Sequence, residues 1–307
     1  MCRIVLFLLA CVPLGVAKRV EAADQPNILF LFSDDHAVKA ISAYGGPLAD
    51  VAPTPNIDRL AREGVVFLNS FCANSICGPS RAPILTGKHN HKDIVRWNYR
   101  RYLRNYLSTV KAVDESVGRL LKYLDDNGLA ENTVVIYSSD QGFYLGEHGW
   151  YDTRWMFEES FRTPFLLRWA GVAKPGSNPS ELIQNIDYAP TFLDTAGLDT
   201  PAEIQGRSLV PLLDGSGKDW RKSLYYAYYE LGEHAVPQHF GVRTQTYKLI
   251  YFPQTDEWNL FDLERDPDEM RSVHAKPEYQ QAREELAAEF ARLRRYFDAP
   301  PFPPRQD

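Results

Sequence analysis

The chain contains 307 residues, of which 44% are hydrophobic and 24% are charged, a composition ordinary for a globular protein of one large or two smaller domains. Its formal net charge is −6 at pH 7. Because nucleic-acid-binding proteins need a basic surface, this acidic balance argues against nucleic acid as a partner. It does not exclude an anionic substrate, since a few local basic groups decide such binding.

Residues 1–22 have the pattern of a secretory signal peptide. A short positive start at Arg3 is followed by an apolar run from Ile4 to Ala10 and by small residues for cleavage near Ala22. The apolar run is too short to span a membrane. We therefore expect an exported chain, periplasmic or extracellular. The leader has a net charge of +2, so the mature part would have −8.

Strands and helices alternate between residues 23 and 215. Continuous apolar runs predict buried strands at 27–32, 65–68, 133–137 and 165–169. Apolar residues at helical spacing predict helices over 55–63, 102–127 and 187–196. We expect Asp187 to cap the last of these helices. The alternation predicts an α/β fold with a mostly parallel sheet flanked by helices.

After Gly215 the character of the sequence changes. Aromatic-rich strands at hairpin spacing are predicted at 224–229, 240–243, 247–252 and 258–263. A final amphipathic helix is predicted over 278–297, and the Pro-rich tail 299–307 is expected to be loose. Residues 216–298 are therefore predicted to form a small antiparallel C-terminal subdomain.

A short helical turn is predicted to open at Cys77, in the run Cys77-Gly78-Pro79-Ser80-Arg81. Proline suits the first turn of a helix, and the cysteine would lie at its positive end. Arg81 lies four residues on, above the same face. Backbone donors and a guanidinium fork suit a sulfate or phosphate oxyanion. Cys72 would form a disulfide with Cys77, or be a lone buried thiol if Cys77 is used chemically.

Carboxylates follow two of the predicted buried strands. Asp34 and Asp35 come after the strand at 27–32, and Asp140 comes after the strand at 133–137. Ligands of open α/β sheets gather at the carboxyl ends of the strands, and converging carboxylates repel one another unless a cation joins them. Hard oxygen ligands favour Ca²⁺ or Mg²⁺. The alternative is that these residues only cap turns.

With these residues in order, the chain resembles the type I sulfatases of the alkaline-phosphatase superfamily. The matching signature is the Cys77–Arg81 run followed by Leu85-Thr86-Gly87. Further similar segments lie at 27–35, 113–149, 206–209 and 258–269. In that family a maturing enzyme oxidises the cysteine to formylglycine, whose hydrate attacks the sulfur of a sulfate ester or sulfamate.

The resemblance implies a role for each matching residue. Asp34, Asp35, Asp140 and Gln141 would hold Ca²⁺, or Mg²⁺, together with the modified Cys77, and Arg81 would orient the formylglycine. One hydroxyl of the hydrate displaces the alcohol or amine, and the second then collapses to the aldehyde and expels sulfate. The implied partners are a sulfated small molecule or glycan and the formylglycine-generating enzyme. The oligomeric state is left open.

The chain departs from the family pattern at two places. Relatives carry a long segment, with a sulfate-contacting lysine and acid–base histidines, that is absent here between about residues 92 and 101. At position 153, where relatives have a second such lysine, this chain has threonine. The available substitutes are Lys88, His89, His91 and His148, each of which has a surface or loop position as its alternative. Arg154, adjacent to Thr153, is a candidate substrate contact, but a neighbouring residue need not point into the same pocket.

Three functions are consistent with these observations. The first is an exported sulfatase acting on sulfate esters or sulfamates. The second is a catalytically impaired sulfatase-like protein, or the product of an internally deleted gene, that binds metal or a sulfated ligand without turnover. The third is a phosphatase or phosphodiesterase of the same superfamily, against which the intact Cys-x-Pro-x-Arg speaks. Because the absent segment carries strands in relatives, we also expect apolar sheet edges.

Overall fold

The computed structural model describes residues 26–72, 99–213, 215, 217, 219–231, 234 and 236–302. The expected leader therefore lies outside the described residues, as does the Cys77 turn with Arg81, Lys88, His89 and His91. Within the described ranges, none of the helices combines the length and apolar character that a membrane span requires.

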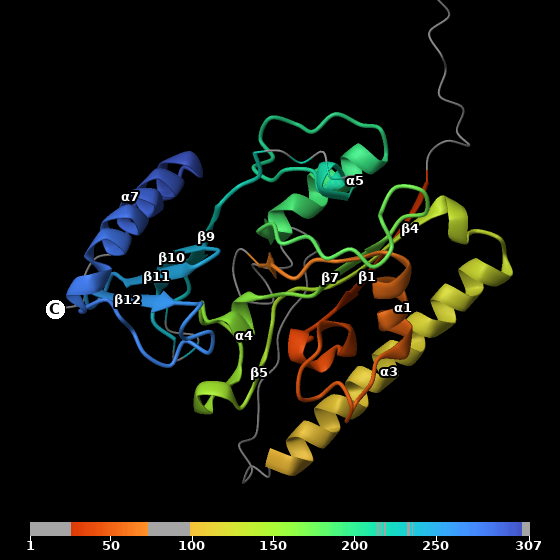
Figure 1. Ribbon diagram of the computed structural model, residues 1–307, viewed down its shortest axis with the longest axis horizontal. Helices are drawn as coiled ribbons and strands as arrows, with labels where there is room; N and C mark the ends of the chain where they lie inside the picture. Colours follow the sequence, from red (N-terminus) through yellow and green to blue (C-terminus); the bar gives the residue numbers. More distant parts are fainter. Residues whose placement is uncertain are drawn as a thin grey trace, which may run out of the picture.

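A four-stranded sheet forms the centre of the N-terminal part (Figure 1). Its strands, in spatial order, are β1 (Asn27–Ser33), β4 (Thr133–Ser139), β7 (Phe165–Arg168) and β2 (Val65–Val66). β1 and β4 pair in parallel, with Asn27 opposite Thr133 and Ser33 opposite Ser139. β7 runs antiparallel to both β4 and β2.

The α/β class is confirmed, and three of the four strands run in one direction. The predicted strand at 165–169 is present but runs against its neighbours, so the sheet is mixed. A parallel neighbour would need a crossover connection, usually through a long helix. The chain between β4 and β7 instead holds short elements: a hairpin of β5 (Tyr144–Leu145) and β6 (Tyr151–Asp152), the turn η5 (Glu147–Gly149) and the four-residue helix α4 (Glu158–Phe161).

Helices cover both faces of this sheet because the strand side chains alternate. Val135 and Tyr137 of β4 face α1 (Pro55–Glu63) and α3 (Tyr99–Asp126). Val134 and Ile136 face α5 (Tyr188–Thr195) and α6 (Val210–Leu213). The two apolar layers account for the strongly apolar strands that the sequence shows.

The remaining short elements connect these layers. They are η2 (Val38–Ala40), η3 (Ser42–Tyr44), β3 (Ser70–Phe71), η4 (Ala130–Asn132), β5 (Tyr144–Leu145), η5 (Glu147–Gly149), β6 (Tyr151–Asp152), β8 (Ile183–Gln184), η6 (Asn185–Asp187) and η7 (Pro277–Tyr279). β3 pairs in parallel with β8. Cys72, directly after β3, is a buried thiol whose Sγ lies 3.2 Å from the Phe161 carbonyl oxygen.

Asp187 does not cap α5 through its side chain, contrary to expectation. Its carboxylate accepts the backbone N–H of Gln184 at 2.9 Å, which closes η6, and forms two 2.6 Å bonds with Arg221. The side chain is fully buried, so a charged partner is needed to compensate its lost hydration. The predicted cap is therefore a buried ion pair.

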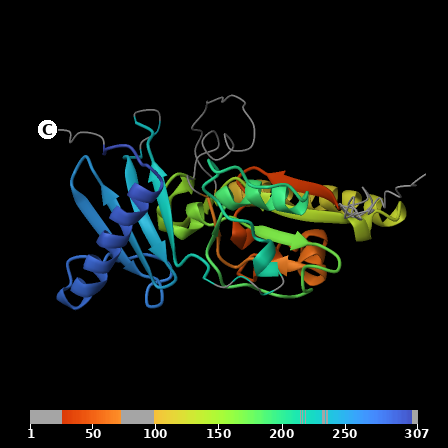
Figure 2. The same cartoon turned by 90° about the horizontal axis from the view of Figure 1, so that it is seen from above.

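The C-terminal part is an antiparallel sheet with one long helix, as predicted. Its strands are β9 (Ser223–Tyr228), β10 (His239–Thr244), β11 (Tyr247–Phe252) and β12 (Glu257–Asp262), in the spatial order β12-β11-β10-β9. Figure 2 shows α7 (Gln280–Tyr296) lying across one face of this sheet. On the other face, Tyr226 and Ile250 pack with Phe161 and Met156 of the N-terminal part.

Candidate functional site

Three carboxylates meet where β1 and β4 end. Asp34 and Asp35 follow β1 directly, Asp140 follows β4, and the parallel in-register pairing brings the two strand ends together. One oxygen atom of each carboxylate lies within 4.8 Å of the others. Asp34 is exposed, Asp35 is half-buried and Asp140 is buried. The structure thus brings together the aspartates that the sequence singled out.

Hydrogen bonds fix these carboxylates relative to one another. The backbone N–H groups of Asp35 and Gln141 both donate to Oδ1 of Asp140, each at 3.1 Å. The side-chain amide of Gln141 donates to Oδ1 of Asp35 at 2.7 Å. Asp35 has a left-handed backbone, with φ of 51°, and Tyr106 of α3 donates to its carbonyl oxygen at 2.7 Å. Hydrogen bonds with Asp140, Gln141 and Tyr106 therefore fix the turn after β1.

Electrostatics make this a site suited to a cation. Burial raises the pKa of Asp35 to about 6; the hydrogen bond from Gln141 opposes this rise, and the nearby Asp140 charge adds to it. Three carboxylates and an amide form a set of hard oxygen donors, which fits Ca²⁺ or Mg²⁺. Asp34, Asp35, Asp140 and Gln141 are thus chemically suited to hold the cation expected from the sequence.

A buried guanidinium lies beside the carboxylates. Arg154 is 8% exposed, pairs through Nη1 with Asp152, and its charge lowers the pKa of Asp35. Its buried Nε has no hydrogen-bond partner among the described residues. Asp152 and Arg154 have φ angles of 81° and 91°, a conformation that non-glycine residues rarely adopt. The Tyr226 hydroxyl donates to the Arg154 carbonyl oxygen at 2.5 Å, which ties this turn to β9.

His148 lies in an aromatic environment and contacts a glutamate. Its Nε2 is 3.4 Å from Oε2 of Glu159, and its ring centre is 4.8 Å from that of Phe157. Glu159 also forms an ion pair with Lys39, whose Nζ lies 3.2 Å from Oε1 of Glu159. His148 therefore lies against Glu159, which in turn pairs with Lys39.

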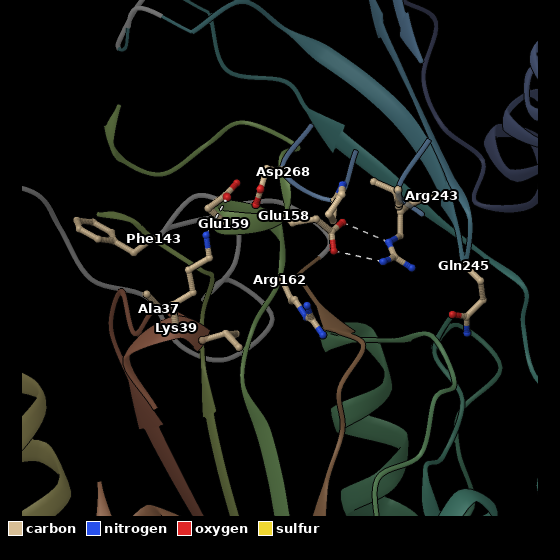
Figure 3. Close-up of a pocket in the computed structure, with 12 residues that line it drawn as sticks. Ala37, Lys39, Phe143, Glu158, Glu159, Arg162, Arg243, Gln245 and Asp268 are labelled. Atoms are coloured by element: carbon tan, nitrogen blue, oxygen red, sulfur yellow. Dashed lines mark hydrogen bonds and ion pairs between the residues drawn. The ribbon is translucent and has the colours of Figure 1, made fainter. Parts of the chain in front are cut away.

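A cavity of about 340 Å³ has Ala37, two residues after Asp35, on its wall (Figure 3). Phe143, two residues after Gln141, lies on its wall and stacks on Tyr106 with ring centres 5.5 Å apart. Charged side chains from both parts of the molecule line the rest: Lys39, Glu158, Glu159, Arg162, Arg243 and Asp268. Figure 3 shows Lys39 directed toward Glu159, and Glu158 toward Arg243.

Sequence reasoning missed several residues of this region. Tyr106 lies inside the helix predicted at 102–127, and its hydroxyl donates to the Asp35 carbonyl and accepts the Ala37 N–H at 2.8 Å. Asp152 and Lys39 lie in β6 and η2, elements of two and three residues that are too short to carry a periodic signal. The adjacent acidic pairs Asp34-Asp35 and Glu158-Glu159 are the sequence signals that indicate a charged environment here.

The sequence matches the family model described as Sulfatase over residues 26–96 and 90–198. A second model, described as N-sulphoglucosamine sulphohydrolase, C-terminal, matches residues 146–296. An N-acetylglucosamine-6-O-sulfatase of Bacteroides thetaiotaomicron is 50% identical over 200 residues, which cover 64% of this chain and 36% of that protein. An arylsulfatase of Clostridium perfringens is 31% identical over 182 residues, covering 57% and 36%.

One solved structure, a protein in complex with its substrate D-glucosamine-2-N,6-O-disulfate, superposes with a TM-score of 0.82. It is 27% identical, and the match covers 89% of this chain and 98% of that one. A 2-O glycosaminoglycan sulfatase has a TM-score of 0.79 at 17% identity over 90% and 93%, which shows the same fold. This chain spans about a third of the length of the first two curated relatives.

The family match is divided, and one relative is longer than this chain over the aligned region. The sulfatase model matches in two pieces that meet at residues 90–96. The alignment with an ulvan-active sulfatase of Formosa agariphila, 22% identical, extends over 409 positions but takes in 88% of this chain and 80% of that protein. Since 88% of 307 residues is about 270, about 140 positions of that relative face no residue here.

Proposed function

The chain belongs to the sulfatase family, and we propose on this basis that it hydrolyses sulfate esters or sulfamates of glucosamine-containing glycans. The observation that carries the proposal is the convergence of Asp34, Asp35 and Asp140 beside the buried Arg154. The names of the Bacteroides relative and of the substrate in the similar complex support this substrate class. Export through the leader at 1–22 is part of the same proposal, since such glycans lie outside cells.

We assign the cation to Asp34, Asp35, Asp140 and Gln141, with Ca²⁺ as the first choice and Mg²⁺ as the second. When bound, it supplies positive charge next to the sulfate group and makes a neighbouring hydroxyl more acidic. The hydrogen bonds from Gln141 and the backbone hold the aspartate oxygens in place before the ion arrives. This preorganisation supports the assignment, because little side-chain entropy is then lost on binding.

The proposed nucleophile is formylglycine made from Cys77, oriented by Arg81. One hydroxyl of its hydrate attacks the sulfur while the bond from sulfur to the leaving oxygen breaks, and that oxygen takes up a proton. The second hydroxyl then loses its proton, the aldehyde reforms and sulfate leaves. Lys88, His91 and His148 remain candidate contacts for substrate, and His148 lies 3.4 Å from Glu159.

Arg154 is proposed to contact the sulfate in place of the lysine that relatives have at position 153. Its guanidinium is buried next to the aspartates. Among the described residues, no acceptor takes the hydrogen bond that its Nε–H can donate. Thr153, in contrast, is 3% exposed and carries no charge. A planar guanidinium can give two parallel hydrogen bonds to a sulfate, which a lysine cannot.

The direct test is mass spectrometry of the Cys77 peptide from protein made with a maturing enzyme, together with assays of sulfate release from glucosamine-6-sulfate and N-sulfoglucosamine. We expect formylglycine at Cys77 and turnover that the Cys77→Ala variant lacks. An unmodified thiol with no sulfate release would exclude the sulfatase activity.

A second candidate function is binding of a sulfated ligand without turnover. The division of the family match at residues 90–96 favours it. The resemblance implies that relatives carry acid–base residues in a segment that this chain lacks between about residues 92 and 101. Calorimetric titration would then give affinity for the sulfated sugar, equal in the wild type and in Cys77→Ala, with no product. Measurable turnover that depends on Cys77 would exclude this candidate.

A further inference from the structure

β1 has the sequence of an interior strand but lies at the edge of its sheet. Residues Asn27–Ser33 contain neither a charged residue nor a proline, and five consecutive residues are apolar. Strands of this type are ordinarily buried on both sides. Among the described residues, however, β1 pairs only with β4. Its residues are exposed or half-buried, whereas every residue of β4 is buried.

Such an edge is a ready template for another strand. Its outward N–H and C=O groups have the geometry of a sheet ladder, and folded proteins ordinarily protect such edges with lysine, proline, a bulge or a covering segment. β1 contains neither lysine nor proline. Ile28, at its start, is 38% exposed, although a strand of this composition is expected to bury its side chains.

The side of α3 that flanks β1 is also uncharged. α1 lies against the other side of α3, where Arg59 pairs with Asp125 at 2.6 Å and the Ile57 N–H donates to Asp114 at 2.9 Å. Since α1 packs over β7 and β2, the opposite side of α3 faces the β1 end of the sheet. That side carries, at helical spacing, Val113, Ser116, Leu120 and Tyr123.

Apolar side chains are exposed along this side. Leu120 is 43% exposed and Tyr123 is 60% exposed, and Leu129, just beyond the helix, is 37% exposed. They form an apolar strip on the α3 side of the open strand, whereas Ile28, opposite Val134 in the register, projects from the other face of β1. We call this strip and the outer edge of β1 the β1 surface. Exposed apolar strips of this kind mark contact surfaces.

We infer that the β1 surface joins two copies of this chain, with β1 pairing antiparallel to β1 of the second copy and the two sheets continuing into one. A two-fold axis at Phe30 would place Leu29 opposite Leu31, and Ile28 opposite Phe32, of the other copy. The strand is thus its own complement, as a two-fold interface requires. Each copy has a net charge of −6, so an uncharged surface is where two copies can meet without repulsion.

The first test is sedimentation velocity of the full chain over a series of concentrations, combined with hydrogen exchange of the same samples. We expect a reversible dimer, and slower exchange of the amides in 27–33 as the dimer fills. A monomer at every concentration would overturn the inference. A dimer that leaves exchange in 27–33 unchanged would overturn it as well.

Two substitutions address the surface directly. Ile28→Lys adds the charge that protects natural edge strands, and Leu120→Glu places a charge on the flanking helix. Each is expected to weaken dimerisation by about tenfold or more. Met270→Lys and Tyr296→Glu are the matched controls, because these residues are 64% and 63% exposed in the C-terminal part.

Circular dichroism and thermal unfolding of the four variants separate loss of pairing from loss of folding. If Ile28→Lys and Leu120→Glu are folded and dimerise as tightly as the controls, the contact lies elsewhere and the inference is wrong.

Discussion

Gln141 donates its side-chain N–H to Oδ1 of Asp35 at 2.7 Å, although 106 positions separate the two residues in the chain. The contact exists because β1 and β4 pair in parallel and in register, so both chains leave the sheet at the same level. It orients a carboxylate whose charged form is disfavoured by burial, since the pKa of Asp35 is raised to about 6. The site is thus arranged to gain stability when a cation is bound.

Removal of Asp140 is expected to abolish the response to a divalent cation. Asp140→Asn removes one of the three converging charges while preserving the size of the side chain. Because a ligand that binds only the folded state stabilises it by an amount that grows with the logarithm of its affinity, the wild type should unfold at a higher temperature with Ca²⁺ present, and the variant should not. The readout is thermal unfolding with Ca²⁺ and with chelator. Asp50→Asn, at an exposed position, is the control, and an equal Ca²⁺ response in all three proteins would contradict the prediction.

Loss of the Arg154 guanidinium is expected to weaken binding of a sulfated sugar by about tenfold to one-hundredfold, the usual worth of hydrogen bonds to a charged group. Arg154→Gln removes the charge, and Arg154→Lys should restore part of the affinity but not the two-pronged contact. Calorimetric titration measures the effect. The exposed Arg119→Gln should bind like the wild type; unchanged affinity in Arg154→Gln would remove Arg154 from the site.

Asp114→Ala is expected to destabilise the fold by about 2–4 kcal/mol, because it leaves buried donors without an acceptor. Asp114 is 3% exposed and accepts the backbone N–H groups of Asn56 and Ile57 at 3.1 and 2.9 Å, at the start of α1. Denaturant unfolding gives the difference. Glu115→Ala, the exposed neighbour on α3, should change stability by less than about 0.5 kcal/mol.

Glu269 is expected to make stability depend on pH between about 4.5 and 7. Burial raises its pKa to about 7, against the opposing charge of Lys248 at 2.7 Å. The folded state therefore holds a proton that the unfolded state has lost, so this contribution is complete below about pH 4.5 and disappears as the pH rises through 7. Relative to Glu269→Gln, the wild type should lose about 1–3 kcal/mol across that range.

The measurement is denaturant unfolding of both proteins at several pH values, with the exposed Asp268→Asn as control. Burial lowers the pKa of His36 and of His239 to about 4, so these residues give stability the opposite slope. They are present in every variant and cancel in the difference. A difference between wild type and Glu269→Gln that stays constant with pH would refute the assignment.

The carboxylate cluster could be predicted because it depends on strand periodicity and on the ends of parallel strands. Asp34, Asp35 and Asp140 each follow a continuous apolar run, and that local pattern survives in the folded chain. The direction of β7 could not be predicted in the same way. It depends on the length and path of the connection after Asp140, which contains no periodic signal.

The position of Arg154 also could not be predicted from the local sequence pattern. The direction of its side chain follows from left-handed backbone angles at Asp152 and at Arg154 itself. The residue types in that segment do not predict these angles. Tyr226, 72 positions later, holds its carbonyl group. The pairing of Asp187 with Arg221 likewise joins residues that only the folded chain brings together. The positions of these residues depend on long-range contacts, which local sequence propensity does not predict.

The separation of β1 from β4 also affects how the protein is made. Asn27 pairs with Thr133, so at typical synthesis rates of roughly 5–20 residues per second the first strand emerges about 5–20 seconds before its partner. During that time an uncharged apolar segment is exposed to every other nascent chain nearby. Yield of the protein in cells should therefore depend on holdase chaperones that bind the segment until β4 has been synthesised.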